Sequence, residues 1–183
     1  MPTSTRTRTP DMPRVLGIDP GSRATGFGVV DGEGAQLVYR GSGVIRTGSG
    51  DLPERLRQIF EGVSAVIAEQ TPDYLAVEQV FVQRNVSTAL KLGQARGTAI
   101  CAGAIRGLPI HEYSPRAVKL ALTGTGTAAK DQVQMMVRHL LGLHGQLQED
   151  ASDALAIALC HLQQSRLGIR TQTALASQWG RKS

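Results

Sequence analysis

Short apolar runs and helical stripes alternate along the chain from residue 14 onward, whereas residues 1–13 show no apolar periodicity. The run RVLGID at residues 14–19 ends at a Pro-Gly pair, which predicts a buried strand. Residues 25–31 and 35–47 are joined by a Gly-Glu-Gly turn, a pattern typical of hairpin strands. We therefore expect three consecutive strands at the start of the fold.

Helical and strand patterns alternate after these hairpins. Asp51 stands at an N-cap position, Pro53 falls in the first turn, and apolar residues recur at helical spacing from Leu56 to Ile67. The remaining predicted elements are a strand at 74–80, a helix at 86–105, a strand at 109–113, a short helix from 115, and helices at 128–143 and 149–164. This order predicts an α/β fold: a mixed five-stranded sheet with helices on both faces.

The chain of 183 residues is the length of one domain with flanking segments. Residues 1–13 are rich in Thr, Arg and Pro and are expected to form a disordered N-terminal arm. Residues 14–164 are expected to form the domain that carries the chemistry. Residues 165–183 are polar and basic, and we expect a flexible C-terminal tail.

Apolar length and cysteine usage limit the class of protein. The longest apolar run covers only residues 154–160, far short of a membrane span. The two cysteines, Cys101 and Cys160, lie far apart and do not form a CxxC pair, which suits a reducing compartment. We expect a cytoplasmic protein without a membrane partner.

Charge is unevenly distributed along the chain, whose formal net charge is +5. Residues 14–78 carry 6 basic and 9 acidic side chains, whereas residues 79–148 carry 8 basic and 2 acidic ones. A basic stretch next to an acidic one fits a polyanionic partner and a metal-binding centre, although such runs also occur on ordinary solvated faces.

Four carboxylates stand out by their positions. Asp19 ends the first strand, Glu78 lies in an otherwise apolar strand, and Asp150 and Asp153 share one face of the last helix. Carboxylates gathered near strand ends repel one another unless a cation neutralises them, and Mg²⁺ prefers such oxygen ligands. Capping or solvation of each acid separately is the alternative interpretation.

Three motifs occur in order along the chain: GIDPGSRATGFGVV near the start, EQVFVQRN with ALKLGQARG in the middle, and DASDALAIA on the last helix. Together they resemble the RuvC family of crossover-junction endodeoxyribonucleases. The resemblance implies a ribonuclease H-like fold and a nuclease that resolves four-way (Holliday) DNA junctions in recombination and repair. It places the family's catalytic and metal-binding acids on Asp19, Glu78, Asp150 and Asp153.

The resemblance also implies cofactors and partners. Each active site would bind two Mg²⁺ ions, for which Mn²⁺ can substitute, and Lys119, Lys130 and Arg84 would contact DNA phosphates. Family members act as homodimers, and the RuvA–RuvB branch-migration complex is an expected partner. The alternatives are a non-catalytic junction-binding protein and a YqgF-type nuclease, which shares the opening motif. Sugar kinases and actin-like ATPases share a similar hairpin but need about twice this length.

Two further features suggest specific contacts. Phe81 stands among polar residues of a turn after the Glu78 strand, so we expect it to stack on an unpaired DNA base; packing beneath the loop is the alternative. Small residues recur every four positions in the helix at 86–105, which favours a subunit contact; packing on its own sheet is the alternative. They are Ala89, Gly93, Gly97 and Cys101.

Overall fold

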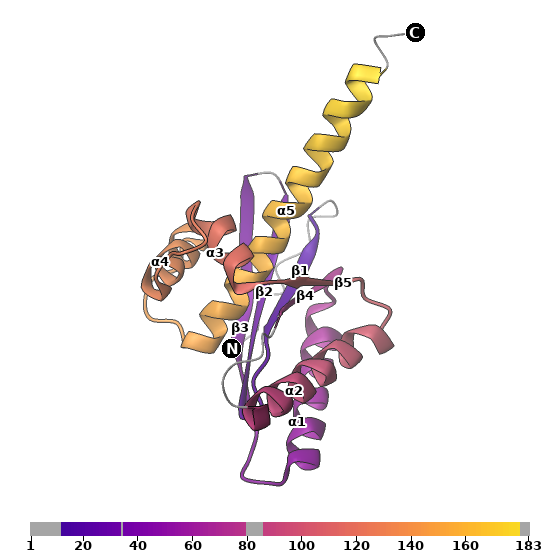
Figure 1. Cartoon of the computed structure of the whole chain (residues 1–183), viewed down its shortest axis with the longest axis vertical. Coiled ribbons are helices and arrows are strands. Elements are labelled where there is room, and N and C mark those ends of the chain that lie inside the picture. The colour runs from indigo at the N-terminus through magenta and orange to yellow at the C-terminus, as the bar shows by residue number, and fades with distance from the viewer. Residues whose placement is uncertain (1–11, 34, 80–85, 180–183) are drawn as a thin grey trace, which may run out of the picture.

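The computed structural model describes residues 12–33, 35–79 and 86–179, with side chains described as far as residue 165. A five-stranded sheet with helices on both faces forms the body (Figure 1). The elements are β1 (Arg14–Asp19), β2 (Ala24–Glu33), β3 (Gln36–Arg46), α1 (Leu52–Gln70), β4 (Tyr74–Glu78), α2 (Val86–Ile105), β5 (Ile110–Tyr113), α3 (Pro115–Thr123), α4 (Lys130–Leu141) and α5 (Glu149–Trp179).

The sheet has the strand order β3-β2-β1-β4-β5, which places β1 at its centre. β1, β2 and β3 pair antiparallel, whereas β4 pairs parallel with β1, and β5 pairs parallel with β4. Ile18 of β1 lies opposite Val77 of β4. Because these two strands are parallel, Asp19 and Glu78 follow that pair at the same edge of the sheet.

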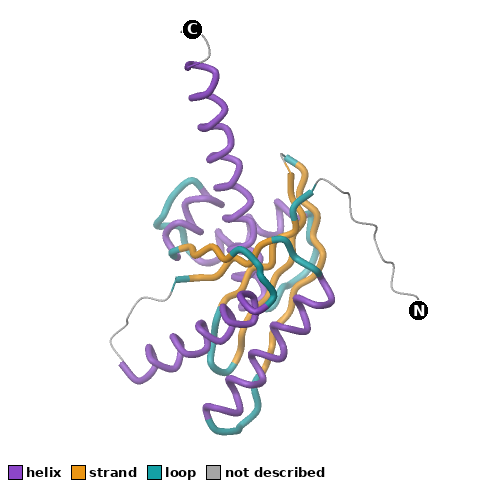
Figure 2. Tube along the Cα trace, turned by 90° about the vertical axis from the view of Figure 1, so that its right-hand side faces the viewer, coloured by secondary structure: helices purple, strands orange, loops and turns teal. Residues whose placement is uncertain are grey.

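Successive side chains of the central strands point to opposite faces and pack into two hydrophobic cores, one on each face of the sheet. Leu16 and Ile18 of β1 pack with α1 and α2, whereas Val15 packs with helices of the α3–α5 layer. Figures 1 and 2 show α1 and α2 together on one side of the sheet and α5 crossing the other. The predicted mixed five-stranded sheet with two helical layers is confirmed.

Two glycines of the sheet allow α5 to approach unusually closely. A Cβ at Gly17 would lie 2.1 Å from the carbonyl oxygen of Ala154, and one at Gly26 would lie 2.0 Å from that of Asp150. Any other residue at either position would force the helix away from the sheet. The glycines thereby hold the acid-bearing first turns of α5 against β1 and β2.

A buried ion-pair cluster joins the first three strands. Asp31 of β2 is fully buried and accepts hydrogen bonds of 2.6 Å from Nε of both Arg14 and Arg40. Burial opposes ionisation of this carboxyl, but the two guanidinium groups outweigh it and lower its pKa. Loss of either arginine would leave a buried charge with one partner fewer, which is destabilising.

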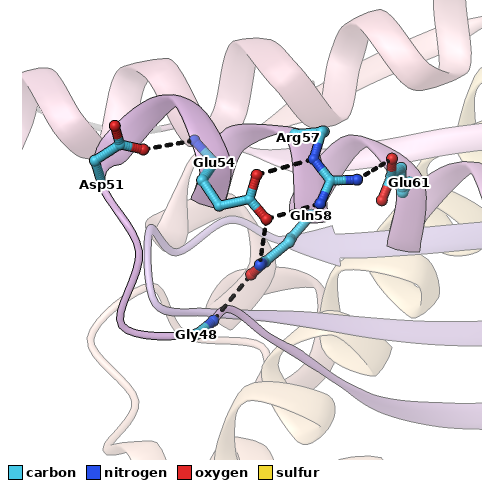
Figure 3. A network of polar contacts seen from close by, with 6 residues as sticks. All are labelled: Gly48, Asp51, Glu54, Arg57, Gln58 and Glu61. Atoms are coloured by element: carbon cyan, nitrogen blue, oxygen red, sulfur yellow. Dashed lines mark hydrogen bonds and ion pairs between the residues drawn. The ribbon is translucent and has the colours of Figure 1, made fainter.

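The start of α1 is stabilised by a polar network at the surface (Figure 3). The Asp51 carboxylate caps the helix by accepting a hydrogen bond of 3.1 Å from the backbone N–H of Glu54. Arg57 donates to the Glu54 carboxylate, and Gln58 links that carboxylate to the backbone N–H of Gly48. The predicted N-cap is therefore present, and it fixes the connection from β3 to α1.

The last helix is longer than the sequence pattern predicts. α5 continues to Trp179, whereas the loss of apolar periodicity predicts an end at about residue 164. Residues 165–179 contain good helix formers and no proline, so a helix nucleated by packing can propagate beyond the body, as Figure 1 shows. The division of the chain into arm, nuclease domain and tail stays a prediction.

Packing also begins slightly before the predicted start of the domain. Met12 is only 5% exposed, and the carbonyl oxygen of Pro13 accepts a 3.0 Å hydrogen bond from the backbone N–H of Gly32. These two residues thus contact the fold, although their sequence shows no periodicity.

Candidate active site

Three of the four predicted acids line one cavity at the edge of the sheet. Asp19 ends β1, Glu78 ends β4, and Asp153 projects from the second turn of α5. The cavity has a volume of about 370 Å³. It is lined by Asp19, Glu78, Pro115, Val118, Lys119, Lys130, Val133, Asp153, Ala156 and Ile157. Residues from five elements, β1, β4, α3, α4 and α5, therefore meet at one polar site with apolar walls.

Asp150 lies next to this group but is not one of the cavity's lining residues. It precedes Asp153 by three residues on α5, and its backbone packs against Gly26 of β2. Its charge contributes to raising the pKa of Asp19, so the two carboxylates are close enough to interact. The structure thus brings the four acids into one neighbourhood, with Asp150 at its margin.

Burial and mutual repulsion disfavour the simultaneous ionisation of these carboxylates. Burial, followed by the charges of Glu78, Asp153 and Asp150, raises the pKa of Asp19 to about 8. The pKa values of Glu78 and Asp153 are also raised, in each case mainly by burial. A group of acids in this state strongly favours a bound cation or proton.

Lys130 supplies a positive charge at this site. Its ammonium Nζ lies 2.8 Å from Oδ2 of Asp153 and 2.5 Å from Oε1 of Glu149. Lys130 is the first residue of α4 and its two partners lie in the first turns of α5, so the beginnings of the two helices are tied together. We predicted a phosphate-binding role for this lysine, and the structure adds a direct contact with one of the acids.

Of the other three residues predicted to contact DNA, the structure describes only Lys119. Lys119 of α3 lines the cavity beside the acids. Phe81 and Arg84 lie outside the described residues, so base stacking by Phe81 and phosphate binding by Arg84 stay predictions.

Arg96 of α2 is a supporting residue that the sequence argument missed. Its Nε donates a 3.1 Å hydrogen bond to the backbone carbonyl oxygen of Glu78, and its guanidinium also pairs with Glu112 of β5. It thereby fastens the acid-bearing end of β4 to two neighbouring elements. Arg96 belongs to the motif ALKLGQARG, but sequence spacing does not reveal a bond to a backbone carbonyl.

The donor set fits a hard divalent cation. Carboxylate oxygens are the ligands that Mg²⁺ and similar ions prefer, and burial together with the neighbouring acids raises the pKa of Asp19, a shift that Lys130 only partly offsets. Among the described residues, no three acidic, histidine or cysteine side chains converge closely enough to form a ready-made ion site. In the arrangement observed, Lys130 instead provides the positive partner of Asp153.

The mixed sheet begins with antiparallel hairpins and carries acids at the ends of two adjacent strands. A helix that bears further acids faces these strand ends. This arrangement defines a nuclease of the ribonuclease H-like class. The family model described as Crossover junction endodeoxyribonuclease RuvC matches residues 15–161. The chain belongs to this family.

Individual relatives match this chain over most of its length. The chain is 60% identical over 151 residues to crossover junction endodeoxyribonuclease RuvC of Methylococcus capsulatus, covering 82% of this chain and 91% of that protein. It is 61% identical over 150 residues to the protein of the same name from Stutzerimonas stutzeri, covering 82% and 86%. The structure of T. thermophilus RuvC in complex with Holliday junction substrate matches with a TM-score of 0.81 and 38% identity, covering 85% and 96%.

These findings confirm the ribonuclease H-like fold, the RuvC family resemblance and the prediction of a Holliday junction endonuclease. Membership in this nuclease family implies a requirement for a divalent metal ion. Within the described residues, no helix has the length and hydropathy needed to cross a membrane.

Proposed function

We propose that the chain cuts four-way DNA junctions with two Mg²⁺ ions, replaceable by Mn²⁺, at a site formed by Asp19, Glu78, Asp150 and Asp153. The observation that carries this proposal is the meeting of three of these acids in one cavity, with Asp150 beside it. When bound, the ions lower the pKa of a water molecule to make a nucleophile and stabilise the leaving 3′ oxygen.

The acids orient this chemistry because their positions are fixed by the fold. Asp19 and Glu78 follow paired residues of two parallel strands, so their separation is set by the sheet. Asp150 and Asp153 are set by the close approach of α5 to Gly26 and Gly17. Together these positions bring the carboxylates into one neighbourhood, and bound ions would draw their oxygens closer, since no three of the described side chains already form an ion site.

Lys130 and Lys119 hold the substrate phosphate in this proposal. Both line the cavity of the acids, and an ammonium group neutralises a phosphate oxygen at such a site. Lys130 is already paired with Asp153, so entry of a phosphate into the cavity would give this ammonium a second anionic partner. The apolar walls formed by residues such as Val118 and Val133 limit the access of bulk water.

We propose that the molecule acts as a homodimer, because paired cuts across a junction need two active sites. The outward face of α2 supports this. A Cβ at Gly93 or at Gly97 would meet no atom within 4 Å, and Cys101 is exposed. Ala95, Ala99 and Ala102 pack on the sheet instead. These observations favour a subunit contact over packing of the stripe on its own sheet.

The wider cellular role follows from the family resemblance. We propose that the dimer works in the cytoplasm with the RuvA–RuvB branch-migration complex, in recombination and DNA repair. Phe81 and Arg84 would contact the DNA near the cut, from the segment that follows β4.

Cleavage of a labelled four-way junction, compared with a linear duplex of the same sequence, tests this function. We expect paired cuts in the junction with Mg²⁺ or Mn²⁺, none after chelation, and little cutting of the duplex. Equal cutting of both substrates would contradict junction selectivity, and cutting that survives chelation would contradict the metal assignment.

A further inference from the structure

A second cavity lies between α4 and α5, next to the cavity of the acids. Its volume is about 280 Å³, and most of its lining is polar. The lining residues are Gln134, Arg138, Gln146, Leu147, Glu149 and Ser152. No step of the proposed cleavage reaction uses this cavity.

Ser152 lines this cavity, and its buried hydroxyl is unsatisfied. The residue is only 2% exposed, and its Oγ has no hydrogen-bond partner among the described residues. A buried hydroxyl without a partner costs about 1–3 kcal/mol, so it normally persists where a ligand or water completes it. The hydroxyl therefore points to a polar ligand.

Arg138 gives the cavity its positive charge. Within the part of the chain that the structure describes, its guanidinium takes part in no ion pair, unlike those of Arg14, Arg40, Arg57 and Arg96. Glu149 is the one acid among the lining residues, and its carboxylate is bound to Lys130 at 2.5 Å. The cavity thus combines an uncompensated cation with neutral hydrogen-bonding groups, which is the chemistry of an anion site.

The position of the cavity relative to the acids suggests which anion it receives. Lys130 and Arg138 are eight residues apart on α4, which is about 12 Å along the helix axis. Phosphates of one strand in B-DNA recur about every 3.4 Å along the duplex axis, so this distance spans roughly three to four nucleotides. A strand that has one phosphate beside Lys130, in a duplex whose axis runs along α4, can therefore place another phosphate at Arg138.

We propose that this second cavity binds a non-scissile backbone phosphate of the junction strand that is cut. Arg138 supplies the charge, and Ser152, Gln134 and Gln146 donate hydrogen bonds to the phosphate oxygens. The inference rests on the proposed function, because it assumes that the scissile phosphate lies among the four acids. It adds a contact that fixes how the strand crosses from α5 to α4.

The test measures junction binding by the full chain in calcium, or in chelator, at several salt concentrations. Arg138→Gln is expected to weaken binding about tenfold, as expected for loss of a charged hydrogen bond, and to reduce the slope of log affinity against log salt by about 0.9. Ser152→Ala is expected to weaken binding about threefold without a change in slope and without lowering the melting temperature. Arg106→Gln is the control, since Arg106 is exposed in the turn after α2, on the other side of the sheet.

A methylphosphonate scan of the cut strand identifies the phosphate itself. Neutralising one phosphate, three to four nucleotides from the cut, should weaken junction binding by the wild type. The same change should leave junction binding by Arg138→Gln unaffected. The proposed phosphate site is wrong if Arg138→Gln binds junctions as Arg106→Gln does. It is also wrong if every methylphosphonate weakens binding by Arg138→Gln as much as it weakens binding by the wild type. Wild type that neither binds nor cuts junctions would instead overturn the proposed function.

Discussion

The ammonium of Lys130 lies 2.8 Å from Oδ2 of Asp153, joining the first residue of α4 to a predicted catalytic acid of α5. Asp153 has its pKa raised mainly by burial, whereas the bond to Lys130 opposes that shift. Lys130 therefore favours the ionised form of a buried carboxylate whose pKa is still raised, next to Asp19, whose pKa is about 8. Without this lysine, the four acids would face one another with no nearby cation from α4.

Replacing Lys130 should therefore impair cutting more than binding. Lys130→Gln removes a charge beside the reacting phosphate, and we expect the single-turnover rate of junction cutting to fall by about 10²-fold. Junction affinity should fall by about tenfold at most, since other basic groups remain. Lys91→Gln, on the exposed surface of α2, is the matched control. Equal losses of rate and affinity would indicate that Lys130 acts only as a general DNA contact.

The dimer proposal leads to opposite expectations for two glycines of α2. Gly97→Leu places its side chain where a Cβ meets no atom within 4 Å, so the subunit should fold normally while dimer dissociation increases. Gly103→Leu would collide with Leu75, whose Cδ2 lies 2.5 Å from a Cβ at that position, and should lower the melting temperature. Sedimentation and thermal melting distinguish the two effects. A Gly97→Leu protein that dimerises like wild type would exclude this face as the interface.

The histidine of α5 predicts how stability depends on pH. His161 is buried, its Nδ1 lies 2.8 Å from the hydroxyl of Tyr113, and burial followed by the charge of His111 lowers its pKa to about 4. The unfolded chain takes up this proton near pH 6.5, whereas the folded protein does not until about pH 4. The contribution of His161 to the free energy of unfolding should therefore fall as the pH falls from 6.5 to 4, by about 3 kcal/mol at most. The raised pKa values of Asp19, Glu78 and Asp153 act in the opposite direction, so this contribution is seen only against a variant that lacks the histidine.

Denaturant unfolding of wild type and of His161→Gln across this pH range isolates the contribution of the histidine. The variant should be less stable at pH 7 but should lose less stability on acidification. Parallel curves for the two proteins would mean that other groups control the acid response.

Much of the architecture could be predicted because it depends on local patterns. Apolar runs and Pro-Gly breaks indicated the strand that ends at Asp19, and the capping pattern at Asp51 indicated the start of α1. The grouping of the acids required the resemblance, since spacing alone does not show that β1, β4 and α5 converge. The end of α5 was missed because the apolar stripe reports packing, whereas a helix can continue without it.

Contacts between distant segments explain most of what the sequence did not reveal. The bond from Arg96 to the carbonyl oxygen of Glu78 involves a backbone atom, which leaves no trace in residue patterns. The bond between His161 and Tyr113 joins residues 48 positions apart. The unpartnered hydroxyl of Ser152 is visible only once α4 and α5 are packed together.

The most direct test of the account is the behaviour of Asp19→Asn, which removes a charge at nearly constant shape. Three measurements on one preparation are needed: junction cutting in Mg²⁺, junction binding in calcium, and thermal stability of the metal-free protein at pH 8. We expect cutting to vanish and binding to persist. Stability should rise by about 1–2 kcal/mol, because one member of a mutually repelling group is neutral. Cutting at the wild-type rate would contradict the assignment of the acids as the catalytic centre.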